Sequence, residues 1–394
     1  MTRSILRRRN ALFVLFFLPG IGIASWVTRT PEVRELVGAR TDQMGYILFG
    51  LSIGSMIGIL SSAVLVARLG TRIVIAAGTA SAALGVATVG AGAFLGDGVV
   101  VAIGLGLFGL GMGGGEVALN VEGAEVERAI GRSVMPLMHG FFSLGTVVGA
   151  VVGMLLTAVA FPVWIHLVVV GALIAVVLVA AVRAIPGGNG RSVGTAERAP
   201  RPAVWKDPGL LLVGGVILAL AMAEGSANDW LPILMVDGHG FDEALAAAVY
   251  AVFAAAMTLG RFVGGWFVDR FGRAAVLGGS ALLGAIGLAV VIFVDSQVGA
   301  AAAVILWGIG ASLGFPVALS AAGDSGDPSE TAARVSFAAT IGYIAFLVGP
   351  PVLGVLGEHY GLRAAMIVVL ALVAVAIFLA PAARTPAERM SARR

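Results

Sequence analysis

Twelve long apolar runs, separated by short polar or charged segments, constrain this sequence more than any other feature. A helix needs about 20 apolar residues to cross the hydrocarbon core of a bilayer, and each run is close to that length. Only 12% of the 394 residues are charged, whereas a soluble domain carries about 25%. The sequence therefore predicts an all-α polytopic membrane protein. The expected spans cover residues 11–28, 44–66, 73–95, 99–121, 134–157, 162–182, 209–231, 245–267, 274–294, 299–321, 335–357 and 362–381.

The basic residues predict how the chain is oriented. Four arginines precede the first run, at positions 3, 7, 8 and 9, and most of the others fall in segments on the same side if every run spans. Because cytoplasmic loops are enriched in Lys and Arg, we expect both termini in the cytoplasm. A signal peptide is the alternative for the N-terminus. The many later spans and the poor cleavage site favour a first membrane span instead.

The two halves of the sequence repeat each other. Residues 67–72 (ARLGTR) follow the second run, and residues 269–273 (DRFGR) follow the eighth. In the same way 117–120 (VALN) recurs as 317–320 (VALS). A polar, basic stretch lies between the halves. We therefore expect a six-span bundle over 1–183, a cytoplasmic linker over 184–207 and a second six-span bundle over 208–394. This organisation is typical of secondary transporters, whose solute site lies between the halves near the bilayer midplane.

Residues 265–273 (GWFVDRFGR) match the GxxxDRxGR loop motif of the major facilitator superfamily, and the chain resembles that family over its whole length. The resemblance implies two pseudo-symmetric six-helix bundles, alternating access and a place in the bacterial inner membrane. It also implies a cytoplasmic gate, formed by Gly265, Asp269, Arg270 and Arg273. The N-terminal copy of the motif departs from the pattern, because Ala67 replaces its aspartate.

A narrower resemblance, to the fucose permease-like group, rests on residues 111–120 (GMGGGEVALN) and 139–145 (HGFFSLG). Glu116 and Asn120 are four residues apart and so share one helix face. A carboxylate at a helix centre costs roughly 2.5–3.5 kcal/mol by insertion scales, so it usually faces a bundle interior or a wet cavity. We expect Glu116, Asn120 and His139 to bind the solute or a coupling proton. A static polar pair that fixes the fourth and fifth spans is the alternative.

Five further residues are candidates. Glu224 and Asn228 share a face of the seventh span, where they are expected to bind the solute or a proton. Trp26 and Tyr343 are the aromatic residues expected to stack on a ring-shaped solute, with packing as the alternative. Arg261 lies inside the eighth span. The family resemblance favours a place for it in the gate, and binding of an anionic solute is the alternative.

The sequence predicts a proton-coupled transporter of a small polar solute, such as a sugar, acting as a monomer in the lipid bilayer. Proton-driven efflux of drugs or metabolites is one alternative, and a non-transporting membrane sensor is another. The chain has no cysteine, and its four histidines show no metal-binding spacing. It also lacks a Walker-type phosphate loop. We therefore expect no enzymatic activity, metal, cofactor or nucleic-acid partner.

Overall fold

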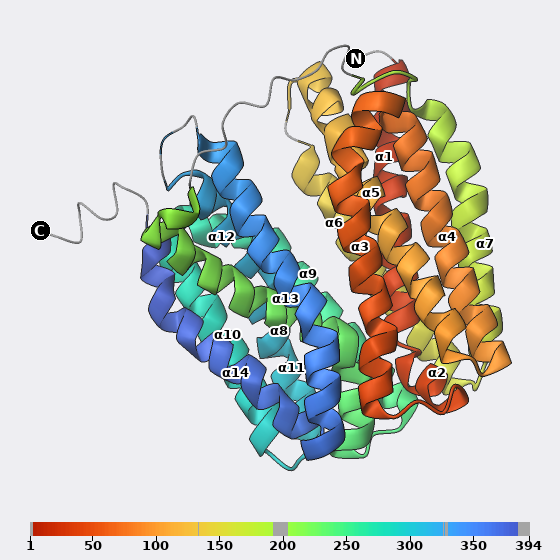
Figure 1. Ribbon diagram of the computed structural model, residues 1–394, viewed down its shortest axis with the longest axis vertical. Helices are drawn as coiled ribbons and strands as arrows, with labels where there is room; N and C mark the ends of the chain where they lie inside the picture. Colours follow the sequence, from red (N-terminus) through yellow and green to blue (C-terminus); the bar gives the residue numbers. More distant parts are fainter. Residues whose placement is uncertain (1–2, 133, 192–203, 326, 328–329, 385–394) are drawn as a thin grey trace, which may run out of the picture. The chain divides into compact units, whose positions relative to one another are not determined.

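Helices form all the regular structure in the residues that the computed structural model describes, which are 3–132, 134–191, 204–325, 327 and 330–384 (Figure 1). Within these residues, twelve spans are long and apolar enough to cross a membrane. The predicted all-α, twelve-span membrane architecture is therefore confirmed. The middle of the predicted linker, residues 192–203, and residues 385–394 lie outside the described residues.

The first of two compact units comprises residues Met1–Thr195 together with Asp242–Ala251. Within it α5 packs against α3 and α4, and α1 packs against α6. Its helices are α1 (Arg3–Val27), α2 (Thr30–Leu36), α3 (Thr41–Leu69), α4 (Thr71–Leu95), α5 (Gly98–Ile130), α6 (Met135–Ala158), α7 (Val163–Ala181) and the 3-10 turn η1 (Val182–Ala184).

The second unit comprises Ala196–Phe241 and Val252–Arg394. Its central helix is α8, which packs against α13, α14 and α12. Its elements are the 3-10 turn η2 (Val204–Lys206), α8 (Pro208–His239), most of α9 (Glu243–Phe271), α10 (Arg273–Phe293), α11 (Gln297–Ser312), α12 (Gly314–Gly323), α13 (Thr331–Tyr360), α14 (Leu362–Leu379) and the 3-10 turn η4 (Ala380–Ala383). The predicted division at 183 and 208 stays a prediction.

Three elements differ from the sequence-based expectation. The helix α5 continues to Ile130 instead of ending near residue 121, and its Glu127 carboxylate accepts hydrogen bonds from the backbone N–H groups of Val134 and Met135 at the start of α6. The short helix α2 was not expected. The tenth span is not one helix, because it breaks at Leu313 between α11 and α12.

Glycines let the helices of each unit approach closely, as is typical where packing rather than water exclusion holds helices together. A methyl group added at Gly104 of α5 would lie 2.6 Å from the backbone nitrogen of Val89 in α4. In the second unit, a methyl group at Gly287 of α10 would lie 2.6 Å from the backbone nitrogen of Trp307 in α11. Both distances are too short for any side chain, so these helices pack backbone to backbone.

The repeated motifs adopt the same backbone conformation. Gly70 joins α3 to α4 with φ 87° and ψ 159°, and Gly272 joins α9 to α10 with φ 81° and ψ 163°. Only glycine adopts such positive φ values without strain. The glycine that the two sequence motifs share is therefore explained by one turn geometry, used once in each unit.

Candidate functional site

The fourth membrane span, α5, places Glu116 on an exposed face. The preceding glycines are buried against α3 and α4; a methyl group at Gly113, for example, would lie 2.5 Å from the carbonyl oxygen of Ser55. Glu116 is exposed, and Asn120, one turn later, is half-buried. The Asn120 side-chain oxygen is buried, and no group in the described part of the chain donates a hydrogen bond to it. The glycine stretch thus fixes one side of α5 and leaves a carboxylate accessible on another.

His139 lies on α6, close to α1. Its ring meets Phe16 edge-on, with centroids 5.1 Å apart, and Phe141 stacks on Phe13 with centroids 4.6 Å apart. His139 is exposed, like Glu116. The aromatic contacts hold α6 against α1 and leave the imidazole accessible.

Trp26 occupies a different environment from the other candidates. The residue is 2% exposed, so nearly all of its surface is buried. This burial favours packing, which the sequence left open beside stacking on a solute.

Glu122 is a buried carboxylate that sequence reasoning missed. Its side chain has no exposed surface and forms an ion pair with Arg8, with Nε and Oε1 2.6 Å apart. The hydroxyl of Thr71 donates to its other oxygen at 2.7 Å, and the Asn189 amide does so at 3.4 Å. Glu122 therefore ties α1 and α4 to the segment that follows η1. Glu122 lies one residue beyond the predicted span 99–121, so its position in the sequence indicated no role inside the bundle.

In the second unit, Glu224 of α8 and Arg261 of α9 form an ion pair that the sequence did not predict. Arg261 Nη2 lies 2.7 Å from Glu224 Oε1, and the two side chains are 29% and 14% exposed. The Arg261 Nε group also donates to the backbone carbonyl of Ser312, at 3.4 Å. The ion pair joins Glu224, which was predicted to bind the solute or a proton, to Arg261, which was predicted to belong to the gate.

The remaining candidates of the second unit lie on α8 and α13. Asn228 and Tyr343 are both half-buried. The ring of Tyr343 lies 6.2 Å from that of Phe315, centroid to centroid. Tyr343 is therefore part of an aromatic group, with some of its surface accessible.

Two of the three charged residues of the loop motif lie at the surface. Asp269 and Arg270 are exposed, and Gly265 has no atom within 4 Å of the position that a methyl group would take. Arg273, at the start of α10, forms an ion pair with Asp324 just after α12, with Nη2 and Oδ2 2.7 Å apart. Arg273 is thus the motif residue that connects α10 to the end of α12 within the second unit.

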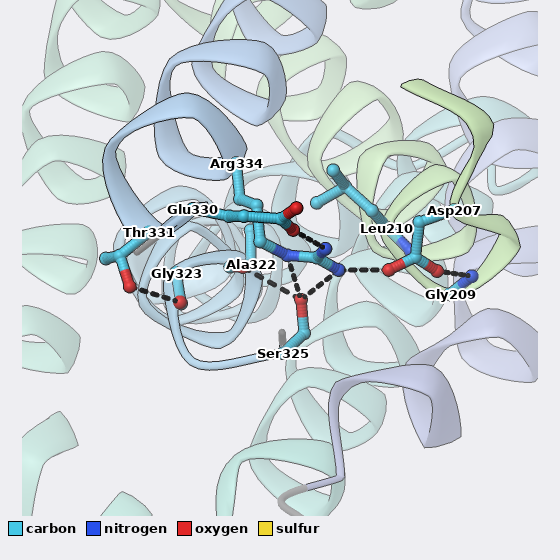
Figure 2. A network of polar contacts seen from close by, with 9 residues as sticks. All are labelled: Asp207, Gly209, Leu210, Ala322, Gly323, Ser325, Glu330, Thr331 and Arg334. Atoms are coloured by element: carbon cyan, nitrogen blue, oxygen red, sulfur yellow. Dashed lines mark hydrogen bonds and ion pairs between the residues drawn. The ribbon is translucent and has the colours of Figure 1, made fainter. Parts of the chain in front are cut away.

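A second polar network, shown in Figure 2, surrounds Arg334. Arg334 is 3% exposed; it pairs with Asp207 and Glu330, and its Nε and Nη2 groups donate to the Ser325 hydroxyl at 3.1 and 2.9 Å. Asp207 also caps α8, because its carboxylate accepts from the Gly209 N–H at 2.8 Å. The hydrogen bond from Arg334 holds the pKa of the Asp207 carboxyl below its usual value. The network fastens the end of the predicted linker to the start of α13.

Comparisons with known proteins point in one direction. A family model described as the Major Facilitator Superfamily matches residues 117–350 and 231–393. An uncharacterised MFS-type transporter of Yersinia pestis is 32% identical over 89% of this chain and 89% of its own length. An uncharacterised transporter of Sinorhizobium fredii is 31% identical over 93% of this chain and 95% of its own length.

Solved transporter structures share the fold. The nucleoside transporter NupG superimposes with a TM-score of 0.79 at 14% identity, covering 95% of this chain and 99% of NupG in one crystal structure. A D-xylose-proton symporter gives 0.75 at 13% identity, with 95% and 97% covered. The Escherichia coli fucose:proton symporter FucP gives 0.66 at 19% identity, with 97% and 100% covered. At these identities the likeness concerns the fold alone.

Proposed function

Because this chain belongs to the major facilitator superfamily of transporters, we propose that it carries a small polar solute across a bacterial inner membrane by alternating access coupled to protons. The transport function and the multi-pass membrane location follow from the family. The solute class, the coupling ion and the orientation are the proposal. Glu116 carries it, because this carboxylate is accessible although it lies within an apolar, glycine-rich span.

The chemistry of Glu116 suits proton coupling. An ionised carboxylate is costly in a bilayer, so an acid at this depth is stable when it faces water, a partner or a solute. A carboxyl group that alternates between wet and dry surroundings gains and loses a proton, because desolvation disfavours its charged form. Asn120, one turn away on α5 and half-buried, supplies amide N–H donors to a hydroxyl-bearing solute. We propose that these two residues bind the solute and the proton.

The other binding residues are proposed with more specific roles. We propose that His139 exchanges a proton or hydrogen-bonds the solute, since an imidazole can both donate and accept. On the second unit, Glu224 and Asn228 supply polar contacts and Tyr343 supplies a ring face. Trp26 is proposed only as a packing residue of α1, because it is buried.

We propose that the loop motif gates the cytoplasmic side. Arg273 fixes the start of α10 to the end of α12 through Asp324. Asp269, Arg270 and Gly265 remain at the exposed surface, where they are available to change partners. A transport cycle would make and break such surface contacts at little cost, because exposed ion pairs contribute only about 0–1 kcal/mol each.

Three structural neighbours handle polar solutes according to their names: a nucleoside, xylose and fucose, the last two with protons. They motivate the choice of sugars and nucleosides as first solutes to test. We further propose that the transporter works as a monomer, with both termini and the linker over 184–207 in the cytoplasm, as the distribution of arginines favours.

The test is solute-induced proton movement in proteoliposomes, with sugars, nucleosides, organic acids and cationic drugs as solutes. We expect one class to change the internal pH with the wild type, and Glu116→Gln to abolish the change because the amide cannot carry the proton. Glu125→Gln is the matched control, since Glu125 lies on the same helix and pairs with Arg128 at the surface. If Glu116→Gln moves protons as well as the wild type does, the proposed role of Glu116 is wrong.

A further inference from the structure

The break in the tenth span has a local cause. The candidate span Gln297–Gly323 consists of α11, which ends at Ser312, and α12, which begins at Gly314. Pro316 lies four residues after Ser312 and has no N–H, so the Ser312 carbonyl lacks its helical donor. Regular bonding resumes with the Val317 N–H, which donates to the Leu313 carbonyl at 3.1 Å. In a bilayer such a carbonyl needs another donor.

Arg261 supplies that donor. Its Nε group points to the Ser312 carbonyl oxygen at 3.4 Å, while its Nη2 group holds Glu224 at 2.7 Å. One planar guanidinium therefore contacts both the break and the carboxylate of α8. Lysine could not do the same, because its ammonium is a point charge without the fixed fork of donors.

The break is packed tightly against α8 and α9. A methyl group at Gly314 would lie 2.5 Å from the Cβ of Leu220, and one at Gly260 would lie 2.7 Å from the Cβ of Ser312. The indole N–H of Trp307 donates to the Ala223 carbonyl at 3.0 Å, next to Glu224 in the chain. A change of bend at the break would therefore displace atoms that contact α8 and α9, the helices that carry Glu224 and Arg261.

The sequence repeat adds a second observation. The alignment that pairs 117–120 with 317–320 pairs Glu116 with Pro316. The fourth span is an unbroken helix with an acid at this position, and the tenth span is a broken helix with a proline there. The two units therefore use the same position differently: one for a charge, the other for a hinge.

From these contacts we infer that Arg261 is a positioning residue, which transmits the state of the Glu224 carboxylate to the break in the tenth span. While Glu224 and Arg261 are paired, the ion pair holds the guanidinium against the Ser312 carbonyl and the break keeps one bend. When a solute takes the Glu224 carboxylate as its partner, Arg261 is released and the break becomes free to bend. This inference rests on the proposed binding role of Glu224.

The test measures the bend itself, without solute or transport. The natural chain has no cysteine, so Ile305→Cys and Ser320→Cys carry spin labels on either side of the break, both at exposed positions. Fifteen residues span about 22 Å in a straight helix. Pulsed spin-resonance distances should show one narrow population in the otherwise unchanged chain. With Arg261→Gln the distribution should broaden and its mean should shift. Glu224→Gln should shift it in the same direction, and the two substitutions together should add nothing.

Two further variants separate this mechanism from a general loss of packing. Pro316→Ala restores an N–H to the Ser312 carbonyl, so it should suppress the shift that Arg261→Gln causes. Arg261→Lys keeps the charge but should not restore the narrow population. Lys206→Gln, which removes an exposed cation stacked on Trp205, should leave the distance unchanged. An unchanged distance in Arg261→Gln, or a shift that Pro316→Ala does not suppress, would overturn the inference. Because no transport is measured, failure of the proposed function would not produce either result.

Discussion

Glu116 and Glu122 stand six residues apart on α5 and meet opposite surroundings. Glu116 is exposed, whereas the Glu122 side chain is fully buried between Arg8 and Thr71. A buried ion pair is costly to form, but its loss is costlier, because the remaining charge keeps its desolvation penalty without a partner. The two acids therefore have separable roles: accessible chemistry at Glu116 and structural fixation at Glu122.

We expect Glu122→Gln to destabilise the protein by about 3–5 kcal/mol, the range found when one partner of a buried ion pair is removed. Glu125→Gln breaks only the exposed pair with Arg128 and should cost about 0–1 kcal/mol. Thermal unfolding in detergent measures both. Glu116→Gln should stay near the wild type in this assay although it loses proton movement. Equal stability of the Glu122 and Glu125 variants would show that the buried pair contributes little.

The sequence alone predicted several residues of the candidate site, but it did not predict their contacts. The identity of Glu116, Asn120 and Glu224 as polar residues inside apolar runs was visible, because hydrocarbon makes such residues conspicuous. Their partners were not visible. The pairing of Glu224 with Arg261 joins positions on different helices, and no spacing rule along the chain reports such a contact. For the same reason Arg8 was interpreted only as an orientation signal.

Close glycine contacts set the geometry of the helices. Gly54 of α3 packs on the backbone of α5: a methyl group there would meet the carbonyl oxygen of Gly106 and come within 2.9 Å of the Leu110 nitrogen. Gly279 of α10 is also helical but has no atom within 4 Å of that position. The same residue type is thus a packing requirement in one helix and a helix-weakening residue in the other.

Gly54→Ala should therefore destabilise the protein by about 1–3 kcal/mol, because backbone atoms cannot move aside and the helices must separate. Gly279→Ala should stabilise it by about 0.5–1 kcal/mol, since alanine is the better helix former and meets nothing. Thermal unfolding of the pair measures the difference. A Gly54→Ala variant as stable as Gly279→Ala would contradict the close approach of α3 and α5.

The positions of the helices were largely predictable, whereas their exact ends and breaks were not. Apolar length located all twelve spans in the described residues. It gave α5 too early an end, because the charged residues after 121 read as a loop although they continue the helix to Ile130. It also missed the break at Leu313, whose cause is Pro316 inside an otherwise apolar run. A run of hydrophobic residues indicates which segment enters the lipid, but it does not indicate where the backbone hydrogen bonds of a helix end or break.

At the scale of the whole molecule, the sequence repeat matters more than any single motif. Gly70 and Gly272 give the same turn in the two units, yet Glu116 and Pro316 make the equivalent fourth and tenth spans different. We propose that the first unit holds the proton-carrying acid and the second holds the hinge.

Solute accumulation driven by an imposed pH gradient is the decisive test of proton-coupled transport by this protein. Proteoliposomes are loaded at high internal pH, diluted into acidic buffer with a labelled solute from the responding class, and assayed for uptake above equilibrium. We expect the wild type and Glu125→Gln to accumulate the solute, a protonophore to collapse this accumulation, and Glu116→Gln to lack it. Uptake that only equilibrates and ignores the gradient, or binding without uptake, would contradict it.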